Sequence, residues 1–231
     1  MPSFLPELAA MKGAMLPPHG KILLLGGELA VGLAQALAKE LASIEQMNGY
    51  PVTPSAMSVW DGAPVLYDFE LLSASLGVNG VPKAPACEAC PPDLVIIFSG
   101  ERNMHWGPVD EGTRKAITHI ADTFAVEARD HYPNMLWVAP PSNPEFDEPA
   151  NQSLLKGMVF SAAQLARPGR SAFLNPKKFE APYPAVGGIL GPDPMMVDHA
   201  RPNEAGYAAI AKQVAEIITK WYGSHPGQAS A

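Results

Sequence analysis

The stretch Lys21-Ile-Leu-Leu-Leu-Gly-Gly-Glu-Leu-Ala30 joins an apolar run to two glycines and then to the start of a helical pattern. Four consecutive aliphatic residues, Ile22 to Leu25, are typical of a strand buried on both faces of a parallel sheet. After the glycines, apolar residues recur at helical spacing on one stripe, at Leu29, Leu33, Leu37, Leu41 and Ile44. This order of strand, glycine turn and helix predicts the first βα unit of an α/β domain.

The same alternation of strand and helix patterns continues along the chain. Further strands are expected at 93–99, 135–139 and 171–174, with a weaker one at 56–60, and helices at 117–128 and 151–166. A last helix is expected from its cap, Asn203, to Trp221. Such alternation predicts right-handed βαβ units around a central parallel sheet, whose ligands bind beyond the carboxyl ends of the strands.

Length and proline content favour one domain with stiff connections. The 231 residues are about one and a half times the ~150 of a typical domain, and we divide them into an N-terminal arm (1–20), one domain (21–223) and a C-terminal tail (224–231). The 25 prolines are roughly twice the usual ~5% share, yet 47% apolar residues are too many for a chain without a core. The prolines gather in the connections 82–92, 133–149 and 176–202, which predicts rigid loops suited to contact with a protein partner.

Charge and cysteine usage exclude several classes of function. The net charge of −7 is spread without a basic stripe, so neither nucleic acid nor an anionic membrane is expected as a partner. No run of ~18 apolar residues is present, and residues 1–20 lack the pattern of a signal peptide, which predicts a cytoplasmic origin and leaves incorporation into a virion or another assembly open. Cys87 and Cys90 form one CxxC without a second pair or a histidine pair to complete a zinc site. We therefore expect no metal and no cofactor, and leave open whether the two cysteines are thiols or a loop disulfide.

Three blocks in this order resemble the SGNH (GDSL-like) hydrolase family. They are Lys21–Ala30, where the family has a strand that leads into Gly-Asp-Ser; Pro92–Asn103, similar to the strand that ends in Gly-x-Asn-Asp; and Val197–Tyr207, similar to Asp-x-x-His-Pro-Asn-x-x-Gly-Tyr. The resemblance spans roughly 21–221. It implies a flavodoxin-like α/β/α three-layer sandwich with a central parallel sheet, in a family of esterases, lipases and carbohydrate acetylhydrolases.

The residues at the family's catalytic positions differ from the family pattern. Glu28 stands where the resemblance places the nucleophilic serine, Arg201 where it places the histidine, and Arg102, followed by Asn103, where it places the asparagine. Asp198 matches the family's aspartate and Gly62 its oxyanion glycine. Arginine stays protonated at neutral pH and cannot act as a base, and a carboxylate at position 28 would oppose the developing oxyanion. The family's serine mechanism is therefore excluded, and these six positions are expected to form a degenerate site.

The substitutions are consistent with one another. Glu28 and Arg201 could form an ion pair, since arginine binds carboxylates in a bidentate geometry and an acid suits the start of a helix. With Asp198 and Arg102 they would make a charged clamp. This predicts a non-catalytic binding or assembly module that acts through protein partners or as a homo-oligomer. The alternative is an esterase or acetylhydrolase in which Glu28 replaces the serine, acting as a base with an arginine holding the substrate.

Other polar residues near the same blocks have simpler interpretations. His199 lies two positions before the family's histidine and is interpreted as a loop residue. For His105 and Trp106, a pocket wall and loop packing both remain open. Asn203 and Tyr207 are interpreted as a helix cap and a core residue.

Overall fold

The computed structural model describes residues 16–17, 19–56, 91–98, 132–139, 171–176, 185–186, 189–190 and 202–223, and six helical positions between 111 and 129. Within these ranges five strands form one parallel sheet: β1 (Ile22–Gly26), β2 (Val52–Ala56), β3 (Leu94–Phe98), β4 (Met135–Val138) and β5 (Ser171–Leu174). A separate antiparallel pair, β6 (Ala185–Val186) and β7 (Ile189–Leu190), follows β5 in the chain. The remaining elements are helix α1 (Glu28–Ala42), the short 3-10 helix η2 (Glu45–Met47) and helix α5 (Glu204–Gly223).

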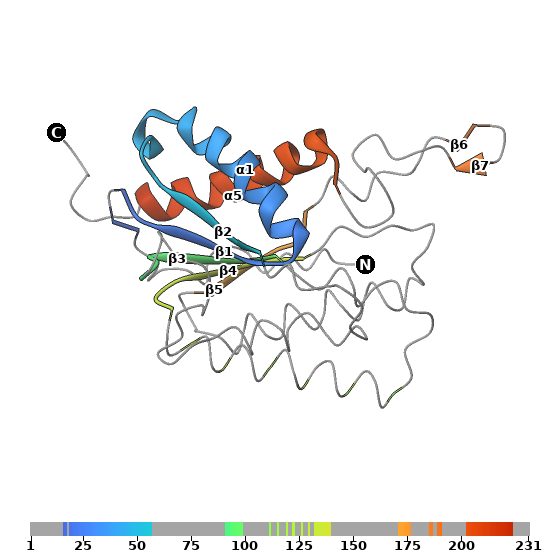
Figure 1. Ribbon diagram of the computed structural model, residues 1–231, viewed down its shortest axis with the longest axis horizontal. Helices are drawn as coiled ribbons and strands as arrows, with labels where there is room; N and C mark the ends of the chain where they lie inside the picture. The colour runs from blue at the N-terminus through green and yellow to red at the C-terminus, as the bar shows by residue number, and fades with distance from the viewer. Residues whose placement is uncertain are drawn as a thin grey trace.

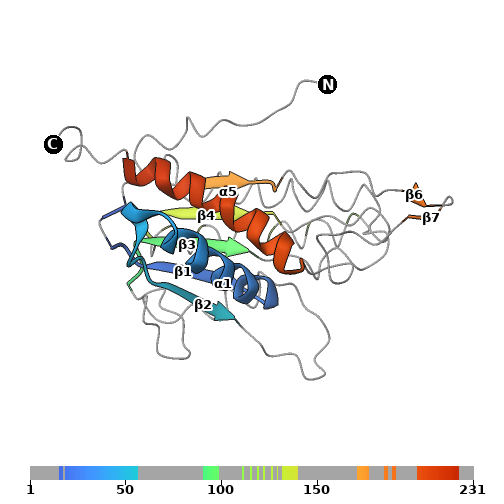
Figure 2. The same cartoon turned by 90° about the horizontal axis from the view of Figure 1, so that it is seen from above.

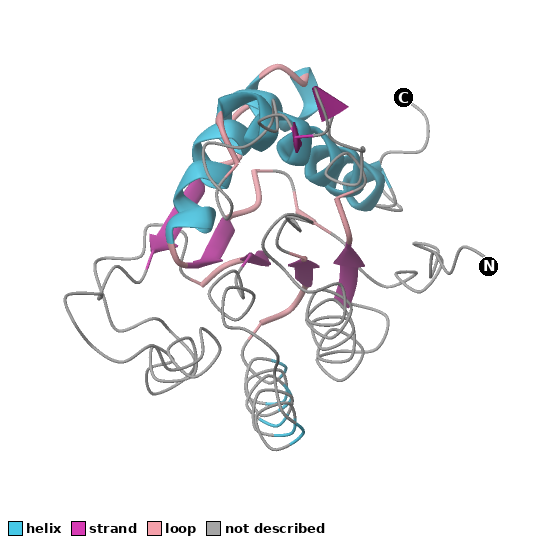
Figure 3. Cartoon of the chain, turned by 90° about the vertical axis from the view of Figure 1, so that its right-hand side faces the viewer, coloured by secondary structure: helices cyan, strands magenta, loops and turns pink. Residues whose placement is uncertain are grey.

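The sheet has the strand order β2-β1-β3-β4-β5. This is the doubly wound, flavodoxin-like order, in which the winding reverses between β1 and β3. Helices α1 and α5 lie on one face of the sheet, and the helical positions between Glu111 and Arg129 lie on the other (Figures 1 and 3). The predicted α/β fold with helices on both faces of a parallel sheet is therefore confirmed.

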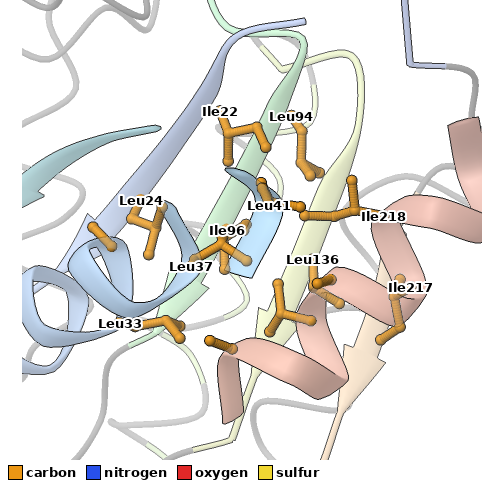
Figure 4. Packing of buried hydrophobic residues seen from close by; sticks show 14 of the residues in the cluster. Ile22, Leu24, Leu33, Leu37, Leu41, Leu94, Ile96, Leu136, Ile217 and Ile218 are labelled. Atoms are coloured by element: carbon orange, nitrogen blue, oxygen red, sulfur yellow. The ribbon is translucent and has the colours of Figure 1, made fainter. Parts of the chain in front are cut away.

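The core between the sheet and the two helices is built from alternate strand residues. Ile22, Leu24, Ile96 and Leu136 face α1 and α5 and pack with apolar residues on both helices, including Leu33, Leu37, Leu41, Ile217 and Ile218 (Figure 4). Each of these side chains is at most 5% exposed. Burial of one such side chain contributes about 1.5–3 kcal/mol, so this layer supplies much of the stability of the fold.

The intervening strand residues are equally buried on the opposite face. Leu23, Leu25, Val95, Ile97 and Trp137 are each at most 1% exposed. Burial on both faces explains why β1, β3 and β4 are continuous apolar runs and do not alternate with polar residues.

Polar contacts fix the amino ends of the strands. The backbone N–H of Lys21 donates to a carboxylate oxygen of Asp93 at 2.7 Å, and the amide of Asn134 donates to the Asp93 carbonyl at 2.8 Å. At the same edge of the sheet the Tyr50 hydroxyl donates to the Pro17 carbonyl at 2.6 Å. Leu16, directly before Pro17, is fully buried in the core. Residues 16 and 17 therefore pack as part of the folded domain.

The expected second strand was misplaced along the chain. We expected it at 56–60, but β2 runs from Val52 to Ala56, paired from Ile22↔Val52 to Gly26↔Ala56; residues 57–60 lie outside the described ranges. This strand is at the edge of the sheet, where a proline such as Pro54 is tolerated, and it lacks the long apolar run that marks a central strand. The other four strands and the last helix lie where they were expected.

Candidate functional site

The reversal of winding between β1 and β3 defines where the fold can hold a site. Parallel α/β sheets bind ligands outside the carboxyl ends of the strands at this point. Here Gly26 ends β1 beside Phe98, which ends β3. Gly26 has φ +154°, and a Cβ on it would lie 2.1 Å from the Phe98 carbonyl oxygen. Only glycine fits this approach, so the two strand ends are held together at the edge where the site is expected.

Helix α1 begins directly at this edge. Gly27 links the end of β1 to Glu28, the first residue of α1, and its carbonyl accepts from the N–H of Ala30 at 3.2 Å. No side chain caps the helix start at Gly27. The first N–H groups of a helix and its dipole favour negative charge at this end, and Glu28 is the first residue of the helix.

Helix α5 begins beside α1 with a conventional cap. The Asn203 side-chain oxygen accepts from the N–H of Gly206 at 3.0 Å, and its carbonyl accepts from the N–H of Tyr207 at 2.9 Å. The predicted cap at Asn203 is thus confirmed. Pro202, directly before it, is buried, so the chain reaches the helix through a packed position.

A close contact between Gly32 and Tyr207 joins the two helix starts. A Cβ on Gly32 would lie 2.2 Å from Cζ of the Tyr207 ring, so the ring rests directly on the backbone of α1. The two helices run parallel from this edge of the sheet (Figure 2). An ion pair between Lys39 and Glu204, with N and O atoms 3.6 Å apart, also links them. Both charged side chains are mostly exposed, so this pair contributes little, and it is the Gly32–Tyr207 contact that sets the spacing.

The structure places one of the six predicted site residues, Glu28, at the edge that the fold reserves for a site. The other five lie outside the described residues: Gly62, Arg102, Asn103, Asp198 and Arg201. The same holds for His105, Trp106, His199, Cys87 and Cys90, whereas Asn203 and Tyr207 are described. In the sequence, Arg201 directly precedes Pro202.

Sequence reasoning missed the roles of Gly26 and Gly32. The sequence pattern indicates only a turn at Gly26, and the stripe of apolar residues that marks the helix does not include Gly32. A single glycine inside an otherwise apolar helix is a signal for close packing, and Gly32 carries that signal.

The shifted pKa values in the described part of the chain belong to other elements. Burial raises the pKa of Tyr132, which precedes β4. Burial also raises the pKa of Asp122, and nearby His119 partly opposes this shift. Within the described ranges, no group of histidine, cysteine or acidic side chains is arranged to hold a metal ion. None of the described helices is both long and apolar enough to cross a membrane.

Comparison with known proteins supports the fold. No family model matches the sequence, and no curated protein matches it. Among solved structures, the acetyl xylan esterase AlAXEase matches with a TM-score of 0.60 at 11% identity, covering 86% of this chain and 99% of the esterase. A variant of an acetyl xylan esterase from Geobacillus stearothermophilus matches with a TM-score of 0.56 at 13% identity, covering 88% and 96%. A carbohydrate esterase family 2 enzyme from Corynascus thermopiles (Myceliophthora fergusii) matches with a TM-score of 0.55 at 18% identity, covering 89% of this chain and 68% of that one.

These matches define the class of fold. The chain is an α/β sandwich with a five-stranded parallel sheet and flanking helices. It shares the SGNH-like hydrolase fold with the acetyl xylan esterases. At these identities the likeness concerns the arrangement of the backbone, and the chemistry of the site has to be argued from the residues.

Proposed function

We propose that this chain is a non-catalytic SGNH-like protein, in which the former active site is a charged structural clamp and the domain serves as a binding or assembly module. The observation that carries the proposal is the place of Glu28. It is the first residue of α1, directly after β1, at the edge where the winding of the sheet reverses. The family resemblance puts the nucleophilic serine at this position.

The names of the structural neighbours support the proposed replacement. Three structures of the Geobacillus stearothermophilus esterase are catalytic mutants, in which alanine replaces a serine, an aspartate or a histidine. In that enzyme the aspartate precedes the histidine by three positions. Asp198 and Arg201 have the same separation in this chain. With Glu28 in place of the serine, the chain keeps one of the three groups and turns the other two into an acid and a permanent cation.

This replacement removes acyl transfer and supplies an ion pair. A nucleophilic hydroxyl needs a base to take its proton, and a guanidinium cannot accept one. A carboxylate and a guanidinium can instead form paired hydrogen bonds. Because the start of α1 also favours negative charge, we propose that Glu28 is ionised and binds Arg201, with Asp198 and Arg102 completing the network.

The first experiment measures ester hydrolysis. The native protein and the Glu28→Ala variant are assayed with a short-chain acyl ester and an acetylated xylo-oligosaccharide, the substrate named for one of the neighbouring esterases. We expect no turnover by either protein. Turnover by the native protein that disappears in Glu28→Ala would contradict the proposal and establish the alternative, an esterase that uses Glu28.

The second experiment is a double-mutant cycle on the clamp. Loss of Glu28 alone is ambiguous, because the carboxylate also interacts with the helix dipole at about 0.3–1 kcal/mol. The cycle Glu28→Ala, Arg201→Ala and the double variant isolates the pair, and we expect a coupling of about 1–3 kcal/mol for a pair joined by charge-assisted hydrogen bonds. The matched control is the exposed pair Lys39 and Glu204, whose coupling should be below about 0.5 kcal/mol. Equal coupling in the two cycles would exclude the clamp.

The third experiment addresses the assembly role. Light scattering after size exclusion, measured over a range of protein concentrations, separates a homo-oligomer from a monomer that needs a different partner. We expect a defined oligomer, or a monomer that binds a protein partner. Stabilisation by a small molecule in a thermal-shift screen, without association with any protein, would argue instead for a ligand-binding pocket without turnover.

A further inference from the structure

The connection between η2 and β2 contains a type II β-turn with Asn48 and Gly49 at its centre. Asn48 has φ −61° and ψ 127°, and Gly49 has φ +94°. The N–H of Tyr50 donates to the Met47 carbonyl at 3.2 Å and closes the turn. The second central residue of this turn type needs a positive φ, which glycine adopts without strain. Both central residues are exposed, whereas Met47 and Tyr50 on either side are buried.

An asparagine followed by glycine in an exposed turn is chemically labile. The amide nitrogen of the glycine can attack the side-chain Cγ of the asparagine, because glycine has no side chain to obstruct the approach. A bond forms between that nitrogen and Cγ, the bond from Cγ to the side-chain nitrogen breaks, and ammonia leaves with the proton of the attacking N–H. Water then opens the cyclic imide at either of its two carbonyl groups, which gives aspartate or isoaspartate.

Asn48 is the asparagine that meets these conditions among the described residues. Asn134 is buried, and its side chain donates to a backbone carbonyl at 2.8 Å. The side chain of Asn203 caps α5. Neither is followed by glycine, and Asn175 is followed by a proline, which has no N–H to react.

The turn can open far enough for the reaction without disturbing the sheet. Attack requires rotation about ψ of Asn48 from its value of 127°, until the Gly49 nitrogen faces Cγ. This rotation breaks the hydrogen bond from Tyr50 to Met47, which lies in an exposed connection and not in a strand. Among the described residues, no carbonyl accepts from the N–H of Gly49. Local openings of this kind are the least costly motions of a folded domain.

The same turn holds the segment that precedes β1. The Tyr50 hydroxyl donates to the Pro17 carbonyl at 2.6 Å, and that carbonyl also accepts from the N–H of Gly20 at 3.1 Å. Nδ1 of His19 lies 2.9 Å from the place of a Cβ on Gly49. His19 itself has φ +56°, a conformation that residues with a side chain rarely adopt. The segment is therefore kept in a strained turn by its contacts with residues 49 and 50.

We propose that Asn48–Gly49 is a site of spontaneous deamidation, and that conversion of Asn48 to isoaspartate loosens the segment before β1. Isoaspartate routes the main chain through its side-chain carbon and so adds a CH₂ group between Met47 and Gly49. With this longer connection the type II turn loses its closing hydrogen bond, and the Tyr50 hydroxyl moves away from the Pro17 carbonyl. The inference goes beyond the proposed clamp and does not depend on it.

The first test incubates the native protein at mildly alkaline pH and maps its peptides by mass spectrometry. Deamidation is detected as the gain in mass when NH₂ is replaced by OH, and isoaspartate by enzymatic methylation. We expect conversion at Asn48 and none at Asn134 or Asn203 over the same period. Fragmentation separates Asn48 from the second Asn-Gly pair, 79–80, which lies outside the described residues. Asn48→Gln should abolish the signal at position 48, and Asn79→Gln should leave it unchanged.

The chain unfolded in urea provides the reference, because its reactivity depends on local sequence alone. If Asn48 is converted in the unfolded chain but stays intact in the folded protein over the same period, the folded turn protects it and the inference is overturned.

The second test measures amide hydrogen exchange before and after conversion. In the isoaspartate form we expect faster exchange at the N–H groups of Gly20 and Tyr50. The N–H of Val95, which donates to the Asn134 carbonyl at 3.0 Å at the same edge of the sheet, should exchange as before. Asn48→Asp is the matched control, since it has the charge of the product without the longer main chain, and it should exchange like the native protein. Unchanged exchange at Gly20 in the isoaspartate form, or equally fast exchange in Asn48→Asp, would contradict the proposed loosening.

Discussion

Gly32→Ala should destabilise the protein, although this substitution normally stabilises a helix. Alanine is favoured over glycine inside a helix by about 1 kcal/mol. At position 32, however, the new methyl group would lie 2.2 Å from Cζ of Tyr207, and 3.4 Å is the lower limit of ordinary contact. Either the ring must swing aside or α1 and α5 must separate.

The size of the effect follows from these two opposing contributions. Forcing one extra carbon into a packed interface typically costs about 1–3 kcal/mol, and a contact this short belongs at the upper end. After the gain in helix propensity, a net loss of about 2 kcal/mol is expected. For a chain of 231 residues this corresponds to a fall in Tm of about 4–8 °C, which is measured by circular dichroism or calorimetry.

Two further variants identify the Tyr207 ring as the cause. In a Tyr207→Ala background the obstacle is gone, so Gly32→Ala should raise Tm there by the few degrees expected from helix propensity. Gln35→Ala, at an exposed position of the same helix, should change stability by less than about 0.5 kcal/mol. If Gly32→Ala raised Tm in the native background as well, the close contact between the helices would be refuted.

Three other perturbations test different parts of the fold. Gly26→Ala should give insoluble or unfolded protein, because its Cβ would lie 2.1 Å from the Phe98 carbonyl oxygen at a φ of +154°; a soluble variant with native Tm would contradict the approach of β1 to β3. Leu16→Ala should cost about 2–5 kcal/mol in chemical unfolding because Leu16 is fully buried, whereas an arm that does not pack would make the change neutral. Folding raises the pKa of Tyr132 above its ordinary value of 10.0, so the folded state holds the phenol proton more tightly and the free energy of unfolding should fall as pH rises above about 10. Tyr132→Phe should reduce this dependence of stability on pH. An equal dependence in both proteins would exclude Tyr132 as its source.

The central strands could be predicted because burial on both faces leaves a clear mark in the sequence. Ile22–Gly26 and Leu94–Phe98 are continuous apolar runs, and no polar alternation competes with that interpretation. The strand Val52–Ala56 has no such run, and among the described strands it pairs only with β1. Its position depends on register with β1, which is a tertiary property, and the sequence pattern therefore placed it too late.

The candidate site, too, could be predicted only where it depends on local sequence. Glu28 could be located at the start of α1 because strand, glycines and helix follow each other directly in the chain. The contacts of Gly26 with Phe98 and of Gly32 with Tyr207 join residues far apart in the sequence, and no local pattern names the partner of either glycine. The backbone frame of the site is thus set by pair contacts that a single sequence does not reveal.

The contacts that position these strand and helix ends do not depend on which residue stands at position 28. The glycines at 26 and 32 and the cap at Asn203 hold the strand and helix ends in place whether residue 28 is a serine or a glutamate. That is consistent with a fold shared with acetyl xylan esterases at only 11–18% identity. The field at the start of α1 stabilises negative charge, and in a hydrolase such a field can serve the oxyanion of the transition state. With Glu28 ionised the field acts on a permanent carboxylate, which would repel an oxyanion beside it.

Hydrolysis that placed its oxyanion at the start of α1 would therefore require Glu28 to be neutral, and the rate would increase as pH falls through the pKa of Glu28. If Glu28 instead served as the base of the alternative mechanism, hydrolysis would increase as pH rises through the same pKa. An absence of turnover on both sides of that pKa is the result that the clamp predicts.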